Sequence, residues 1–316
     1  EVQMVMRAHW RRGRLSLSTT PHQVSRLLMT LAFSLGGLYL TAVLPLTGGP
    51  WELGFNAVSA QAFCALRQPH RAQQRLFPES SSLETFLEST TGPVAPKSTK
   101  RFVYASSSSV YGVKEEPNVH EEMTLEPLTD YSRFKADCEK ILAEYQTDEF
   151  TTVTIRPATV CGYSKRQRLD VVVNILTNLA YHKREITVFG GSQLRPNIHI
   201  ADMVQAYVTL LEAPTEKIAG KIFNAGYENQ SVTELAETVK DVIGEDVKLT
   251  VTPTDDNRSY HISSEKIRHE LGFVAQHSIR EAVVDLVEAF EKGKLPNSLT
   301  HERYFNIQRM QSLNLV

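Results

Sequence analysis

Apolar and polar residues follow two periods from residue 101 onward, which predict alternating strands and helices. The stretch RFVYASSSSVYG (101–112) predicts a buried strand that runs into a serine cluster and a glycine turn. The β-branched stretch TTVTIRPATVCG (151–162) predicts a second strand that ends in a loop. A helix is expected between them, with Asp130 as its N-cap. Its apolar positions recur at helical spacing: Phe134, Cys138, Ile141, Leu142 and Tyr145.

The last third of the chain shows the same alternation. Residues 231–244 predict a helix with a capping box, Ser231 with Glu234, and a glycine stop. Residues 278–293 repeat that design, and residues 247–253 between them predict a short strand. Strands that alternate with helices predict an α/β fold, here with a small C-terminal α/β domain.

Tyr131 and Lys135 are four residues apart in the segment YSRFK, so on a helix they project from one face. A nearby ammonium favours the phenolate, which makes a tyrosine a usable base nearer neutral pH. Such a pair by itself is also common on solvated helix faces. The serine cluster favours a site, because ligands of open α/β sheets bind at the carboxyl ends of the strands.

In order and spacing, six segments resemble the extended short-chain dehydrogenases/reductases, specifically the NAD-dependent nucleotide-sugar epimerase/dehydratase group. They are SSSSVYG, YSRFK, RPATVCG, TVFGGSQLRPNIHIADM, GKIFNAG and NRSYHISSEKIRHELGF. The resemblance covers roughly residues 100–316. It implies a Rossmann-like parallel sheet and a catalytic set of Ser107, Tyr131 and Lys135. Phe134 departs from the family, which usually has Ser or Thr before the lysine.

The resemblance also implies ligands. It assigns NAD to Tyr131, Lys135, Pro157 and Ala158, with NADP as an alternative, and implies a homodimer. The family's substrate is a nucleotide sugar. The corresponding substrate positions are Ser108, Thr159 and two arginines that hold phosphates in the family, Arg195 and Arg258.

Two serines narrow the implied chemistry. The sugar dehydratases of the group carry Asp-Glu directly after the catalytic residue, where this chain has Ser108 and Ser109. Serine hydroxyls do not exchange protons with carbon near neutral pH, so an epimerase or a ketosugar reductase is expected instead. The other open alternative is an inactive or truncated family member that cannot bind NAD.

The glycine-rich loop that such enzymes use for the pyrophosphate is missing from residues 1–100. Their seven glycines include no three with the G-x-x-G-x-x-G spacing. Residues 1–96 also contain no Lys, Asp or Ile, and only five of the 36 acidic residues precede residue 101. This break falls where the resemblance begins.

Two explanations for the N-terminal third stay open. One is a frame artefact or misjoined gene that replaced the first half of the Rossmann domain. The other is a membrane anchor, because residues 27–46 carry no charge and follow several arginines. The expected domains are 1–97, atypical; 98–163, the second Rossmann half; and 164–316, mainly substrate-binding, with some segments that return to the Rossmann domain. A cytoplasmic location is expected, with anchoring through 27–46 as the alternative.

The net charge and the cysteines argue against a nucleic-acid-binding, a disulfide-rich or a zinc-binding protein. A net charge of −2 without a basic tract argues against nucleic acid as a partner. The three cysteines, Cys64, Cys138 and Cys161, form neither a disulfide framework nor a zinc pattern, so no metal is expected.

Overall fold

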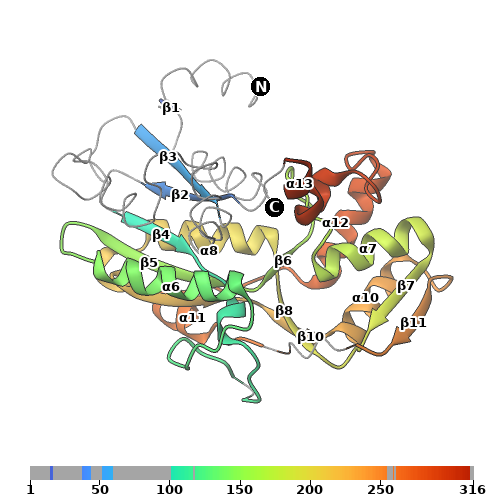
Figure 1. Ribbon diagram of the computed structural model, residues 1–316, viewed down its shortest axis with the longest axis horizontal. Helices are drawn as coiled ribbons and strands as arrows, with labels where there is room; N and C mark the ends of the chain where they lie inside the picture. The colour runs from blue at the N-terminus through green and yellow to red at the C-terminus, as the bar shows by residue number, and fades with distance from the viewer. Residues whose placement is uncertain are drawn as a thin grey trace. The chain divides into compact units, whose positions relative to one another are not determined.

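The computed structural model describes residues 15–16, 38–43, 52–59, 101–116, 118–254, 259 and 261–313 (Figure 1). The chain divides into two compact units. Unit 1 comprises residues 1–106, 129–155 and 207–222, and unit 2 comprises residues 107–128, 156–206 and 223–316.

The sheet of unit 1 is six-stranded, with the order β1-β3-β2-β4-β5-β9. β4 and β5 pair in parallel, whereas the pairs β1–β3, β2–β3 and β2–β4 are antiparallel. The strands are β1 (Leu15–Ser16), β2 (Leu38–Val43), β3 (Glu52–Ser59), β4 (Arg101–Ala105), β5 (Thr151–Pro157) and β9 (Lys221–Ala225). The last residues of β5 and β9 belong to unit 2.

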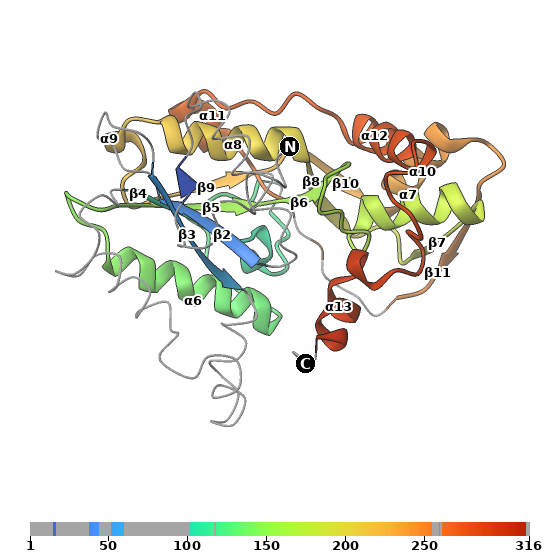
Figure 2. The same ribbon diagram turned by 90° about the horizontal axis from the view of Figure 1, so that it is seen from above.

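Helices cover this sheet on both faces. Figure 2 shows α6 (Asp130–Glu144) on one face and α8 (Ile200–Glu212) with the short α9 (Thr215–Ile218) on the other. The apolar stripe of α6 packs on β4. The buried members of this cluster are Phe102, Tyr104, Cys138, Leu142 and Phe150. The predicted apolar spacing of this helix is therefore the spacing that meets the strand.

Unit 2 contains two small sheets. β6 (Thr159–Cys161), β8 (Leu194–His199) and β10 (Glu228–Ser231) form one, in the order β10-β8-β6, and β7 (Glu185–Phe189) pairs in parallel with β11 (Lys248–Thr252). Its longer helices are α7 (Val172–Lys183), α10 (Val232–Ile243) and α12 (Ile279–Glu291), which share one apolar core with β7 (Figure 1). The short helices are η2 (Ser108–Tyr111), α11 (Glu265–Leu271), η3 (Glu302–Tyr304) and α13 (Asn306–Ser312).

Most predicted elements of residues 101–316 are confirmed. Both capping boxes form, at Ser231 for α10 and at Ser278 for α12, and the predicted strand at 247–253 is β11. Two expectations were wrong in detail. The expected strand is β5, but the loop expected after it contains a second strand, β6, in another sheet. The N-cap of α6 is Thr129, whose Oγ1 accepts from Ser132 N at 3.2 Å. Asp130 is instead the first helical residue.

The N-terminal third is described only in part. Within the stretch 27–46, Leu38–Val43 is a strand and not part of an apolar helix, while the rest of the stretch lies outside the described residues. Of the helices that the structure describes, none is long and apolar enough to cross a membrane. The three domain boundaries predicted from the sequence stay predictions.

Candidate active site

β4 and β5 run side by side in unit 1 as far as Ala105 and Ile155. All five residues of β4 are buried, and Ser106 N, directly after the strand, donates to Ile155 O at 2.8 Å. The chain thus stays paired until Ser106 and becomes irregular only from Ser107 onward. This edge is the carboxyl end of two parallel strands, where open α/β sheets bind ligands.

α6 presents Tyr131 and Lys135 toward this edge. Lys135 Nζ donates to Ala105 O at 2.6 Å, so the lysine is tied to the last residue of β4. The ammonium lies 5.8 Å from the ring centroid of Tyr131 and 5.1 Å from that of Tyr104. Tyr131 is half-buried, whereas Lys135 is only 5% exposed. The expected pairing of the two side chains on one helix face is therefore present, and the pair is not on a solvated face.

Burial changes the titration of Lys135. Desolvation lowers the pKa of its ammonium to about 7, while Cys138 and Glu139 act in the opposite direction. Near neutral pH the lysine is therefore poised between its charged and neutral forms. Burial also raises the pKa of the Tyr104 phenol well above its ordinary value. Tyr104 thus stays protonated where Lys135 titrates.

The serine cluster forms a short turn in unit 2. Ser107 is the N-cap of η2, and its Oγ accepts from Ser109 N at 3.2 Å and lies 2.9 Å from Ser109 Oγ. Ser107 and Ser109 are half-buried, whereas Ser108 is buried. The turn ends at Gly112, which adopts a positive φ of 73°. An added Cβ there would lie 2.1 Å from Glu126 O, so only glycine fits.

A buried polar network holds this turn, and sequence reasoning missed it. Tyr111 OH donates to Asn224 Oδ1 at 2.8 Å and accepts from Arg156 Nη1 at 2.8 Å. Arg156 also donates to Glu121 O, and Glu121 Oε1 accepts from Asn224 N at 2.6 Å. Burial raises the pKa of the Glu121 carboxyl and raises that of the Tyr111 phenol to about 12. No spacing rule could have found residues so far apart in sequence, although a Tyr and an Arg inside apolar runs were a signal.

The segment after β5 lies in unit 2 as well. Pro157 is the last residue of β5, Ala158 N donates to Ala225 O at 2.8 Å, and Thr159 begins β6. Pro157 and Thr159 are half-buried and Ala158 is buried. The chain therefore changes sheets at this point, next to the end of β9.

Of the two predicted phosphate-binding arginines, the structure describes one. Arg195 lies on β8 opposite Gln230 of β10, and its Nη1 donates to Leu194 O at 3.0 Å. Arg258 lies outside the described residues. Its neighbour Ser259 accepts a hydrogen bond from Leu194 N at 3.0 Å, which brings that stretch of chain to β8.

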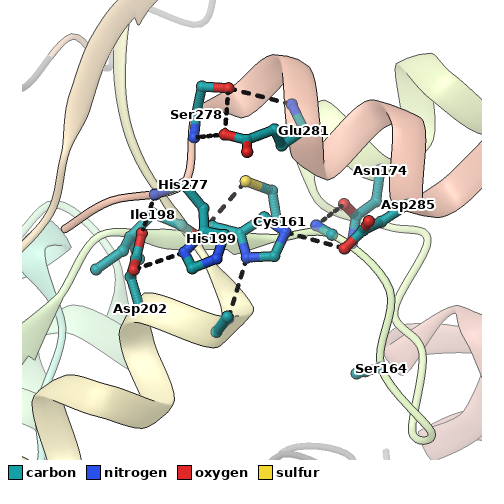
Figure 3. Close-up of polar contacts among 12 residues, drawn as sticks. Cys161, Ser164, Asn174, Ile198, His199, Asp202, His277, Ser278, Glu281 and Asp285 are labelled. Atoms are coloured by element: carbon teal, nitrogen blue, oxygen red, sulfur yellow. Dashed lines mark hydrogen bonds and ion pairs between the residues drawn. The ribbon is translucent and has the colours of Figure 1, made fainter.

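His199 and Asp202 make hydrogen bonds around the start of α8. Figure 3 shows the stacked rings of His199 and His277, whose centroids are 4.9 Å apart. His199 Nδ1 accepts from Ala201 N and its Nε2 faces Asp285 Oδ2 at 3.2 Å, so the histidine, not Asp202, binds the first turn of α8. Asp202 instead accepts from the amides of Gln276 and His277. These contacts tie the start of α8 to the segment before α12.

The predicted catalytic residues divide between the two units. Tyr131 and Lys135 belong to unit 1, where Lys135 contacts the end of β4, whereas Ser107 belongs to unit 2. Pro157, Ala158, Thr159 and Arg195 also belong to unit 2. The convergence of Ser107 with Tyr131 stays a prediction. Among the residues that the structure describes, no His, Cys, Asp or Glu cluster could hold a metal ion.

Fold and site together define an α/β protein with a Rossmann-like parallel strand pair and a Tyr-x-x-x-Lys helix at its edge. Residues 93–226 match the model of the NAD dependent epimerase/dehydratase family. The match includes Ser107, Tyr131 and Lys135 and ends at Gly226, the residue after β9.

Two curated relatives illustrate the similarity. A dTDP-D-glucose 4,6-dehydratase of Mus musculus is 29% identical over 207 residues, which are 61% of this chain and 56% of the relative. The uncharacterized UDP-glucose epimerase YtcB of Bacillus subtilis is 34% identical over 155 residues, which are 48% of each chain. This chain thus spans about half the length of these two relatives.

Solved structures agree on the fold. The UDP-glucuronic acid 4-epimerase of Bacillus cereus, solved in complex with UDP-glucuronic acid and NAD, superimposes with a TM-score of 0.58 at 23% identity. The superposition covers 66% of each chain. At that identity the likeness establishes the Rossmann-type fold and nothing finer.

Proposed function

We propose that the chain carries the acid–base centre of an NAD-dependent nucleotide-sugar epimerase, with Tyr131 as the proton acceptor. The observation that carries the proposal is the contact of buried Lys135 with the carboxyl end of β4, one helical turn from Tyr131. This contact lies inside the family match.

The proposed reaction assigns one step to each residue. Tyr131 removes the proton from a sugar hydroxyl, and the Lys135 ammonium stabilises the phenolate before the step. Ser107 Oγ donates a hydrogen bond to the same sugar hydroxyl. NAD, when bound, would accept a hydride from the sugar carbon and return it to the other face of that carbon.

The chain fits the two ends of NAD unequally. At the nicotinamide end, Tyr131 and Lys135 offer a phenol and an ammonium at a strand edge, and the half-buried Pro157 is the last residue of the parallel partner strand β5. At the pyrophosphate end, residues 1–100 contain no glycine triplet of the required spacing and no recognisable acidic ribose partner. We therefore expect the chain as given to hold NAD weakly.

Epimerisation is proposed over dehydration because of the serines that follow Ser107. Because both residues are serines, neither offers a carboxylate or a carboxylic acid to the neighbouring sugar carbons. Ser108 is also buried, and the hydroxyl of Ser109 lies within hydrogen-bond distance of Ser107. A ketosugar reductase uses the same Tyr131 and Lys135. It differs in consuming the reduced cofactor, which makes the two activities separable by cofactor balance.

The proposal is tested by comparing sugar turnover by the Tyr131→Phe variant with turnover by the unmodified protein. Two proteins are compared: the full chain, and a chimera in which the glycine-rich half of a relative replaces residues 1–97. Each is incubated with millimolar NAD and with UDP-glucose, UDP-glucuronate or dTDP-glucose. NMR should show an epimer from the chimera, slower or absent in the full chain. Tyr131→Phe in the chimera should lower the rate by about 10²- to 10⁴-fold.

The exposed Tyr227 gives a matched control, because Tyr227→Phe removes a hydroxyl from unit 2, whereas Tyr131 lies in unit 1. Its rate should equal that of the unmodified chimera. A dehydrated sugar as the product, or full activity in Tyr131→Phe, contradicts the proposed function. Net consumption of reduced cofactor identifies the reductase instead.

A further inference from the structure

A buried carboxylate lies on α6 that the proposed reaction does not use. Residues 131, 135 and 139 are four positions apart, so Tyr131, Lys135 and Glu139 form a row along one face of the helix. Glu139 is 7% exposed and Lys135 is 5% exposed. Charged side chains are seldom buried to this degree without a partner, so the row calls for a physical explanation.

The row contacts two consecutive residues where β4 ends. Lys135 Nζ donates to Ala105 O at 2.6 Å, and Ser106 Oγ donates to Glu139 Oε1. Ser106 is fixed from its other side as well, because its backbone N–H donates to Ile155 O. The next residue along the chain is Ser107. Glu139 therefore binds the residue that precedes the candidate catalytic serine, and its charge favours the nearby ammonium of Lys135.

We propose that Glu139 is a positioning residue, which keeps the buried Lys135 ammonium charged and, through Ser106, fixes the point where the chain leaves β4 for Ser107. Its catalytic meaning rests on the proposed function. The electrostatic part concerns only unit 1 and is testable without any turnover.

The other groups near Lys135 do not supply the negative charge. Four titratable side chains face its ammonium or act on it: Tyr104, Tyr131, Cys138 and Glu139. Burial raises the pKa of the Cys138 thiol to about 11 and that of Tyr104 well above its ordinary value, so both are neutral where Lys135 titrates. Tyr131 is the group on which the lysine acts. The carboxylate of Glu139 is left as the group that offsets the burial of the ammonium.

The titration of Lys135 in Glu139→Gln tests the proposal. The full chain is labelled with ¹³C-lysine, the Lys135 signal is assigned by its absence in Lys135→Met, and its chemical shift is followed from pH 5 to 10. The midpoint, about 7 in the unmodified chain, should fall by about one pH unit or more without the carboxylate. A midpoint that does not move overturns the proposal.

A matched control comes from the same helix. Glu144 is exposed near the end of α6, so Glu144→Gln removes an equal charge that water already screens. The Lys135 midpoint should stay unchanged in this variant. Ser106→Ala keeps the Glu139 carboxylate. The fall of the Lys135 midpoint should therefore be smaller in Ser106→Ala than in Glu139→Gln. An equal fall in both variants would show that only packing is involved.

A second measurement keeps the proposal falsifiable if Glu139→Gln does not fold. Two coupled groups each report the other's titration, so the carboxyl carbon of Glu139 in the unmodified chain should show a step at the pH where Lys135 loses its proton. That step should be absent in Lys135→Met. If the unmodified chain shows no such step, the two side chains are not coupled and the proposal fails.

Turnover separates this inference from the proposed function. In the active chimera, Glu139→Gln should move the pH–rate limb that reports Tyr131 to higher pH, because a less charged Lys135 stabilises the phenolate less. A shifted Lys135 midpoint without turnover of any sugar supports the positioning role and overturns the proposed function. Turnover with an unshifted Lys135 midpoint supports the proposed function and overturns the positioning role of Glu139.

Discussion

At the scale of single residues, burial decides the chemistry of Lys135. The lysine is tied to Ala105 O by a short hydrogen bond, yet desolvation brings the pKa of its ammonium down to about 7. The same helix places Tyr131 on one side of it and Glu139 on the other. One face of α6 thus contains an acid–base group, the cation that tunes it and a carboxylate that offsets the burial of the cation.

The lowered pKa of Lys135 predicts a stability that depends on pH. The folded-state pKa of about 7 lies below the ordinary value of 10.5, so between these values the unfolded chain binds more protons than the folded chain. The folded state therefore gains stability as pH rises through this window. Relative to Lys135→Met, the unmodified chain should gain about 1.4 kcal/mol per pH unit between pH 7.5 and 9.5.

Urea unfolding of both chains at several pH values measures this difference. Lys140 lies on the exposed side of α6, so Lys140→Met should show no such trend against the unmodified chain. A constant difference between Lys135→Met and the unmodified chain across the window would mean that Lys135 keeps an ordinary pKa in the fold.

At the scale of elements, a hydrogen-bond network fixes the turn that contains the serine cluster. η2 is a four-residue helix between β4 and a long loop, and its last residue, Tyr111, is held by Arg156 and Asn224. The loop that follows is fastened to the same network through Glu121. The conformation of the serine turn thus depends on contacts that reach across unit 2.

Gly112→Ala should damage this turn severely. The added methyl group would lie 2.1 Å from Glu126 O, and the residue would also need a left-handed φ. We expect a loss of more than ~3 kcal/mol in the free energy of unfolding, since the backbone strain of a left-handed residue alone costs about 1–2 kcal/mol. Urea unfolding measures this loss.

Gly272 offers the matched control. It has a similar φ of 72° at the C-terminus of α11, but no atom lies within 4 Å of an added Cβ. Gly272→Ala should therefore cost only the backbone strain, about 1–2 kcal/mol. Equal losses in the two variants would show that the loop at Glu126 yields to the methyl group.

At the scale of the whole molecule, the two regions of the chain differ in what they offer a dinucleotide. Residues 93–226 match the family and contain the Tyr–Lys helix. In the first hundred residues, the described strands pair in antiparallel fashion and the sequence contains no glycine-rich loop. The sequence of that region therefore contains no recognisable motif for the adenosine and pyrophosphate half of NAD.

Calorimetry with NAD tests this view of the molecule. The chain as given should show no saturable heat below millimolar NAD, because backbone amides at a helix N-terminus supply much of the pyrophosphate affinity in dinucleotide-binding folds. The chimera with a restored glycine-rich half should bind with a saturable isotherm. A micromolar affinity for the unmodified chain would mean that residues 1–97 form a dinucleotide site of another design.

Local signals in the sequence predicted most of the elements from β4 onward. The i, i+4 spacing of Tyr131 and Lys135, the capping boxes at Ser231 and Ser278 and the strand before the serine cluster all depend on neighbours within a few residues. Interactions of this range are encoded by spacing and side-chain chemistry alone, so a single sequence is enough to locate them.

Only the tertiary structure decided which distant groups meet. It divided residues 151–162 between two sheets, joined Tyr111 to Arg156 and Asn224, and brought Ser106 to Glu139. The sequence determined that a tyrosine and a lysine share a helix face. The packing of that face against β4 decided that the lysine is buried, because desolvation depends on neighbours that no local spacing specifies.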